Sequence, residues 1–254
     1  LSKCAKMVFE FDKAVIDIIN EHAVGVKPQI AFYEKLGFYG LKTYKNTISY
    51  AKKKKLIVIA DVKRGDIGTT SEAYANAYLS GTTITNNHKK IFDADAMTIN
   101  PYLGEDGVMP FVKAAKETGK GIFILVKTSN QGSKDLQDII TEDKTPVYLS
   151  VAKLVEKWGK EVIGKNGYSS IGAVVGATFP EQSKQIRETL KQCFFLLPGY
   201  GSQGATADDI KHCFNKNGLG ALVTASRSII YAYENTDDVN WQDKIKDAVI
   251  KMKN

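Results

Sequence analysis

The sequence predicts an α/β protein, and its pattern favours a (β/α)8 TIM barrel whose first strand is absent from the 254 residues. Short runs rich in Val, Ile, Leu and Phe recur along the whole chain, and longer amphipathic segments separate them. Polar and charged residues also follow nearly every one of these runs. Strands that alternate with helices indicate a parallel sheet with right-handed crossovers.

Seven apolar runs are the expected strands. They lack a strict alternation of apolar and polar residues, which is typical of strands covered on both faces. The expected strands are residues 23–27, 56–63, 96–100, 121–129, 172–178, 194–201 and 221–226. The segments with helical character are residues 2–20, 71–80, 106–118, 146–158, 180–191 and 206–215. The polar connection 130–146 is interpreted as a mobile loop over a site.

Seven strands fit either a doubly wound sheet or a barrel with one further strand. A barrel places the carboxyl ends of all its strands on one rim around a central site. A doubly wound sheet concentrates functional residues at one switch point instead. Because polar residues end nearly every run, the barrel is favoured. The chain opens with a helical segment, so the eighth strand is expected to precede Leu1. No linker interrupts the pattern, which predicts one domain over residues 1–254.

The composition restricts the class of partner. A formal charge of +7 favours anionic ligands such as phosphates. The densest basic run, Lys52 to Lys55, lacks interleaved aromatic residues and is interpreted as a solvated helix end, so no nucleic-acid partner is expected. No apolar stretch approaches the roughly 20 residues of a membrane helix, and no secretory signal is visible.

The cysteines and histidines argue against a metal site. Three cysteines without metal-type spacing indicate reduced thiols of a cytoplasmic protein. The three histidines are far apart in the sequence, which makes a zinc site or a Ser-His-Asp triad improbable.

A glycine-rich loop at residues 199–204, GYGSQG, matches the G-x-G-x-x-G dinucleotide fingerprint. That motif alone is a weak signal, and here no acidic residue ends a strand about 20 residues later. In a barrel, the loops after the last two strands commonly bind phosphate. Gln203 lies in the first of these loops, and Ser226 and Arg227 lie in the second. Exposed backbone N–H groups and a guanidinium suit phosphate oxygens, so a phosphate site is predicted.

A charged quartet surrounds the end of the second run. Asp61 and Lys63 are two residues apart, so on a regular strand their side chains point to the same face. Lys27 ends the preceding run, and Asp66 follows in the loop. A salt-bridge network that ties loops together is the alternative interpretation. Against it, buried charges are costly to desolvate unless they are paired, and the neighbouring glycines suit a rigid brace poorly.

These motifs resemble those of one enzyme family. DVKRGDIGTT at 61–70 is similar to the D-x-K-x-x-D-I-x-x-T signature of orotidine 5′-monophosphate decarboxylases. The similarity continues, in order, through VKTSN at 126–130, PGYGSQG at 198–204 and SRSI at 226–229. TINPYLG at 98–104 resembles the branch found in many bacteria and some protists.

The resemblance implies a homodimeric barrel that converts orotidine 5′-monophosphate to UMP and CO₂, the last step of new pyrimidine synthesis. It implies that no metal and no organic cofactor take part. The alternating Lys-Asp-Lys-Asp array of the family falls on Lys27, Asp61, Lys63 and Asp66, and the partner subunit supplies the last of these together with Ile67 and Thr70. The remaining implied contacts are the pyrimidine ring with Ser129 and Pro198, the ribose with Gln29, and the phosphate with Gln203 and Arg227, with Ser226 beside them.

Two other functions stay open on the sequence alone. A magnesium-dependent hexulose-phosphate synthase on the same barrel shares a D-x-K-x-x-D core, although the DIGTT tail and Lys27 argue against it. A non-catalytic protein that binds a phosphate ligand would not need the charged quartet. One departure from the family is visible, because the first strand and its ribose-binding aspartate do not occur in this sequence.

Overall fold

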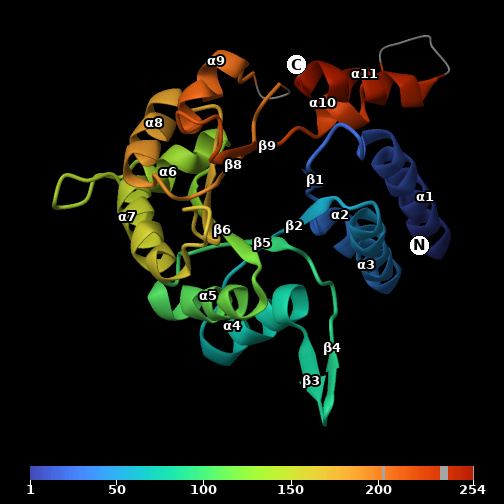
Figure 1. Cartoon of the computed structure of the whole chain (residues 1–254), viewed down its shortest axis with the longest axis horizontal. Coiled ribbons are helices and arrows are strands. Elements are labelled where there is room, and N and C mark those ends of the chain that lie inside the picture. The colour runs from blue at the N-terminus through green and yellow to red at the C-terminus, as the bar shows by residue number, and fades with distance from the viewer. Residues whose placement is uncertain (202–203, 235–239, 254) are drawn as a thin grey trace. The chain divides into compact units, whose positions relative to one another are not determined.

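The computed structural model describes residues 1–201, 204–234 and 240–253 (Figure 1). Seven strands form one sheet in the order β1-β2-β5-β6-β7-β8-β9. The pairs β1–β2, β6–β7, β7–β8 and β8–β9 are parallel. These strands are β1 (Gly25–Val26), β2 (Ile57–Arg64), β5 (Ala96–Ile99), β6 (Gly121–Lys127), β7 (Ile171–Val175), β8 (Phe195–Leu197) and β9 (Ala221–Val223).

The seven strands coincide with the seven apolar runs, which confirms the predicted α/β class. All residues of β5, β7 and β8 are buried, as expected for strands covered on both faces. No strand precedes β1 within the described part of the chain, so the expected eighth strand is not among these residues.

The helical segments named from the sequence are present, and the structure adds two long helices, at residues 37–53 and 241–253, and several short elements. They are α1 (Ser2–Ile19), α2 (Ala31–Glu34), α3 (Gly37–Lys53), α4 (Gly68–Ala75), α5 (Glu105–Thr118), α6 (Lys134–Gln137), α7 (Val147–Gly159), α8 (Pro180–Thr189), α9 (Ala207–Ile210), α10 (Arg227–Ile230) and α11 (Trp241–Lys253). A π-helical turn, η1 (Asn76–Ser80), extends α4, and three 3₁₀ turns are η2 (Gln131–Ser133), η3 (Lys160–Val162) and η4 (Lys211–Cys213). The connection 130–146, expected as a loop, therefore contains η2 and α6.

An antiparallel hairpin, β3 (Thr82–Ile84) and β4 (Asn87–Lys89), was not predicted. Its two strands expose nearly every residue, so the sequence carries no buried face to indicate them. A two-residue turn joins them, with Thr85 at a φ of 52°.

The chain divides into two compact units. The first consists of Leu1–Val62, Asn76–Met97 and Ser226–Asn254, and the second of Lys63–Ala75 and Thr98–Ala225. The single domain over residues 1–254 stays a prediction.

In the first unit, α1 packs against α3 (Figure 1). Asp12 on α1 accepts hydrogen bonds from the Tyr33 hydroxyl at 2.9 Å and the Thr47 hydroxyl at 2.7 Å. Burial raises the pKa of the Asp12 carboxyl above its ordinary value. The ring of Trp241 stacks on Phe11 at 5.6 Å, which joins α11 to α1. Lys54 caps the carboxyl end of α3, as the basic run predicted.

In the second unit, Arg187 on α8 binds the backbone next to the strands β8 and β9. Its side chain is buried and donates to the backbone carbonyls of Leu190, Cys193, Cys213 and Gly220. The guanidinium also lies 3.5 Å from the ring centre of Phe195. Burial lowers the pKa of Arg187 to about 10. Cys193 and Gly220 lie just before β8 and β9, so Arg187 holds the chain where these strands begin.

Candidate active site

Lys27, directly after β1, forms an ion pair with Asp61 on β2. The Lys27 Nζ donates to Asp61 Oδ2 at 2.8 Å, and the two side chains are 18% and 7% exposed. The chain beyond β1 continues beside β2, because the Asp61 N–H donates to the Pro28 carbonyl and the Ile30 N–H donates to the Asp61 carbonyl. Lys27 and Asp61, two members of the predicted quartet, are therefore in contact. The ammonium of Lys27 offsets the cost of burying the Asp61 carboxylate.

Lys63 lies at a break in the extended conformation of β2. Its φ is 45°, in the left-handed region that few residues other than glycine adopt. Its N–H donates to the Thr98 hydroxyl on β5 at 2.9 Å, while its side chain is exposed. Because the backbone is not extended here, strand alternation from Asp61 does not by itself fix the direction of the Lys63 side chain. Such strained residues cluster at active sites.

Asp66 is held by its own loop. Its Oδ1 accepts the Ile67 N–H at 2.8 Å, and the Ser71 hydroxyl donates to its carbonyl at 2.6 Å. Gly107 allows the close approach of α5, since a Cβ there would lie 2.8 Å from the Asp66 carbonyl oxygen. Ile67 is 53% exposed and Thr70 is also exposed, so an apolar and a hydroxyl side chain stand beside the half-buried carboxylate.

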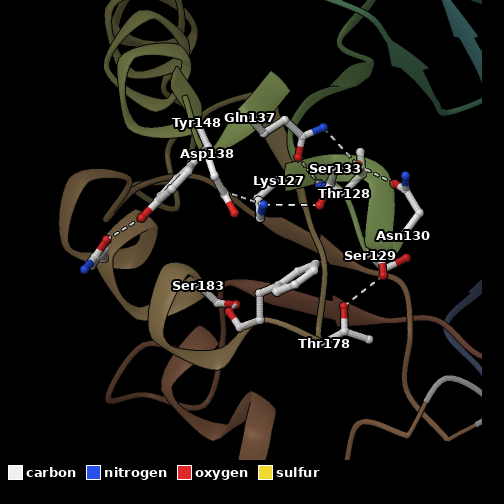
Figure 2. A network of polar contacts seen from close by, with 12 residues as sticks. Lys127, Thr128, Ser129, Asn130, Ser133, Gln137, Asp138, Tyr148, Thr178 and Ser183 are labelled. Atoms are coloured by element: carbon white, nitrogen blue, oxygen red, sulfur yellow. Dashed lines mark hydrogen bonds and ion pairs between the residues drawn. The ribbon is translucent and has the colours of Figure 1, made fainter. Parts of the chain in front are cut away.

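Ser129 follows β6 in a polar network (Figure 2). Its carbonyl accepts the Thr178 hydroxyl at 3.0 Å. Gly176 lies so close that a Cβ there would come within 2.7 Å of the Ser129 Cα. On the other side, Gln137 makes two hydrogen bonds to Thr128, each 2.9 Å long. The backbone that carries Ser129 is therefore held on both sides.

Lys127 is one of the polar residues that end the strands, but sequence reasoning gave it neither a role nor a partner. It is the last residue of β6 and is fully buried, yet it carries a charge. Its Nζ donates to Asp138 Oδ1 at 2.6 Å and to the Ser133 hydroxyl at 3.2 Å (Figure 2). The sequence offered one signal, a lysine at the end of an apolar run, but nothing identified Asp138 as its partner.

The predicted phosphate loops are described in part. Pro198 is half-buried, and the glycines that follow, Gly199 and Gly201, have φ values of 108° and 71°. Gln203 lies outside the described residues. Ser226 precedes α10 and Arg227 begins it, and both are exposed. The turn has glycines at positive φ and Arg227 is exposed, and the phosphate site itself stays a prediction.

Gln29 has a local role in the first unit. Its Oε1 accepts the Ala31 N–H at 3.1 Å at the start of α2, and the residue is half-buried. Its backbone pairs with Asp61 as an isolated parallel bridge. The side chain therefore lies in the segment that also carries Lys27.

Within residues 1–201, 204–234 and 240–253, no cluster of three or more His, Cys, Asp or Glu side chains is arranged to hold a metal ion. The helices of the same residues include none that is both long and apolar enough for a membrane span.

A family model described as "Orotidine 5′-phosphate decarboxylase / HUMPS family" matches residues 10–240. This match spans most of the chain. The chain belongs to the orotidine 5′-phosphate decarboxylase / HUMPS family. Membership confirms the resemblance that the motifs carried and the barrel class of the fold.

Named relatives lie on the decarboxylase side of the orotidine 5′-phosphate decarboxylase / HUMPS family. An orotidine 5′-phosphate decarboxylase of Caldicellulosiruptor bescii is 48% identical over 229 residues, which are 90% of this chain and 75% of the relative. One of Clostridium kluyveri is 45% identical over 231 residues, 91% and 76% of the two chains. The solved structure of Leishmania donovani OMP decarboxylase is 28% identical with a TM-score of 0.76, covering 98% of this chain and 89% of that one. The synthase and the non-catalytic alternative receive no support.

Proposed function

We propose that this chain decarboxylates orotidine 5′-monophosphate to UMP and CO₂ without a metal or an organic cofactor, at the last step of pyrimidine synthesis. The observation that carries the proposal is the buried ion pair between Lys27 and Asp61. Asp61 lies on β2, the strand that also contains Lys63 and is followed by Asp66. The decarboxylase names of relatives up to 48% identical support the same reaction.

The reaction needs charge from the protein. When the bond between C6 of the pyrimidine and the carboxylate breaks, its electron pair stays on C6, which has no adjacent carbonyl to delocalise it. No cofactor serves as an electron sink, so fixed charges must stabilise this carbanion. Lys63 is the proposed source of that charge. Its ammonium stabilises the carbanion, gives C6 a proton, and regains a proton from solvent afterwards.

The two aspartates have separate proposed roles. Asp61, fixed by Lys27, orients the Lys63 ammonium from one side and faces the substrate carboxylate. Asp66, fixed by the Ile67 N–H, supplies the second negative charge. The two carboxylates together favour the cationic state of a lysine placed between them.

Substrate binding is proposed to use residues remote from C6. Ser129 recognises the pyrimidine, Pro198 lines the ring and Gln29 contacts the ribose. Gln203 and Arg227, with Ser226 beside them, bind the phosphate. The exposed Arg227 guanidinium suits this role, because it can donate two parallel hydrogen bonds to phosphate oxygens. Binding energy from these remote contacts can be used at the reacting carbon.

A homodimer completes the proposal, with Asp66, Ile67 and Thr70 acting in the active site of the partner subunit. The exposure of Ile67, at 53%, and of Thr70 leaves both side chains accessible to a partner subunit. A cytoplasmic location is also proposed, because Cys4, Cys193 and Cys213 are free thiols.

The test is direct conversion of the substrate. The purified chain is mixed with orotidine 5′-monophosphate in excess EDTA, and the ultraviolet change on forming UMP is followed. We expect turnover that EDTA leaves unchanged and that Lys63→Ala abolishes. A folded wild-type chain that leaves the substrate intact would refute the proposal. Complete inactivation by EDTA, reversed by magnesium, would point to the synthase instead.

A further inference from the structure

Lys127 is a buried cation that the proposed reaction does not use. An ammonium removed from water is stable only where opposite charge and hydrogen-bond acceptors replace the water. Here the replacement comes mainly from the segment 131–138, through the carboxylate of Asp138 at 2.6 Å and the hydroxyl of Ser133 at 3.2 Å. The ring of Phe179 also faces the Nζ at 4.5 Å. The contacts of the Lys127 ammonium with Asp138 and Ser133 therefore hold the segment 131–138 against the end of β6.

Gln137 precedes Asp138 in this segment, and its side chain binds Thr128 next to the end of β6. Its Oε1 accepts the N–H of Thr128, and its Nε2 donates to the Thr128 hydroxyl, both at 2.9 Å. The Thr128 hydroxyl donates in turn to Asn130 Oδ1 at 2.7 Å. One amide thus fixes both the backbone and the side chain of the residue that precedes Ser129 (Figure 2).

The opposite side of Ser129 offers no room to move. The Thr178 hydroxyl donates to the Ser129 carbonyl, and Gly176 contacts the Ser129 backbone at a distance that excludes any side chain. A rotation of the Thr128 backbone would therefore turn the Ser129 side chain rather than shift the whole segment.

We propose that Lys127 and Gln137 are positioning residues that hold Ser129 in the orientation that recognises the pyrimidine ring. This inference rests on the proposed function and adds a specificity role for the segment 131–138. Lys127 acts through Asp138, and Gln137 acts through Thr128. Neither side chain is assigned a contact with the substrate.

The experiment compares one ligand with a pyrimidine ring and one without. Dissociation constants of UMP and of ribose 5-phosphate are measured by titration calorimetry for the wild type and for Gln137→Leu. Gln131→Leu is the matched control, because Gln131 is exposed in the same segment. We expect Gln137→Leu to weaken UMP binding about tenfold, as loss of the hydrogen bonds that hold Thr128 predicts. Ribose 5-phosphate binding should stay unchanged in both variants, and Gln131→Leu should bind UMP like the wild type.

Lys127 is tested by a pair of variants with opposite expectations. Lys127→Met removes the charge and should reproduce the selective loss of UMP binding, together with a lower kcat/KM for orotidine 5′-monophosphate. Lys127→Arg keeps a cation that can reach Asp138, and should restore most of the UMP affinity. If Lys127→Met does not fold, the half-buried Gln137 still decides the matter, since Gln137→Leu leaves the buried ion pair intact.

Two results would overturn the inference. Unchanged UMP binding in Gln137→Leu would mean that Ser129 does not depend on this network. An equal loss for UMP and ribose 5-phosphate would mean that the network only stabilises the fold. Failure of the proposed function is distinguishable from both, because the wild type itself would then neither bind UMP nor consume orotidine 5′-monophosphate.

Discussion

Replacing Lys27 by methionine should reveal how strongly the buried ion pair couples to Asp61. Lys27→Met keeps most of the side-chain volume and removes the charge that lies 2.8 Å from Asp61 Oδ2. Asp61 is only 7% exposed at its side chain, so water cannot readily take the place of the ammonium. The change therefore removes the Lys27 ammonium from beside a buried carboxylate.

The expected loss of stability follows from these exposures. Removing one partner of a fully buried pair costs about 3–5 kcal/mol. Because the Lys27 side chain retains 18% exposure, the lower end of that range, about 3 kcal/mol, applies here. Removing both charges, in Lys27→Met combined with Asp61→Asn, should cost less, since the carboxylate that lost the Lys27 ammonium is then neutral as well. We therefore expect a coupling free energy of about 2–3 kcal/mol between the two positions.

The assay is a double-mutant cycle read by denaturant unfolding and by enzyme activity. Trp241 and Trp158 report on the first and second unit respectively, so fluorescence and circular dichroism together test whether one transition is observed. The cycle compares Lys27→Met, Asp61→Asn and the double variant with the wild type. All three variants should lose decarboxylation, including the double variant, whose stability is largely restored. A coupling below about 0.5 kcal/mol, the value of an exposed pair, would refute the reasoning. So would a double variant that regains activity along with stability.

Three further outcomes are expected. Arg227→Ala should weaken binding of orotidine 5′-monophosphate by about 1.5–3 kcal/mol and leave the phosphate-free nucleoside unaffected, and an equal loss for the nucleoside would remove the phosphate assignment. Inactive Lys63→Ala and Asp66→Asn proteins, mixed so that subunits exchange, should recover activity in about a quarter of all sites if Asp66 acts across a two-fold interface, whereas no recovery despite proven exchange would place it within its own chain. The buried Asp12 has a raised pKa, so its folded state holds a proton more tightly than its unfolded state, and stability should fall as the pH rises from the ordinary value of 3.8 through the raised value. Asp12→Asn should flatten that part of a stability-against-pH curve, and an unaltered curve would assign the dependence to other groups.

The sequence predicted those parts of the fold in which buried positions are occupied by runs of apolar residues. The strand β7 was visible because all five residues are apolar or glycine and all are buried. The hairpin β3–β4 left no such trace, since its residues face solvent and its turn depends on a positive φ at Thr85. Helix ends were approximate for a similar reason, because capping at Gly104 and Gly119 depends on left-handed backbone that composition does not specify.

The site was predictable where chain neighbours or neighbouring strands bring the residues together. Lys27 directly follows β1 and Asp61 lies on the adjacent parallel strand β2, so their meeting followed from the predicted sheet. The pairing of Lys127 with Asp138 could not be foreseen, because an intervening 3₁₀ turn and the short helix α6 bring the two together. The left-handed backbone at Lys63 was equally invisible, since nothing in DVKRGD marks one residue as departing from the strand.

The backbone at position 63 has a consequence for anyone who engineers this enzyme for heat resistance. A lysine at a φ of 45° is conformationally strained, and glycine would relax that strain at a net gain of up to about 1 kcal/mol. A screen that selects variants only by melting temperature would therefore tend to replace the lysine on which the proposed chemistry depends. Libraries built on this scaffold should hold position 63 constant and take their stabilising changes from strained residues elsewhere, such as Lys55 and Lys144.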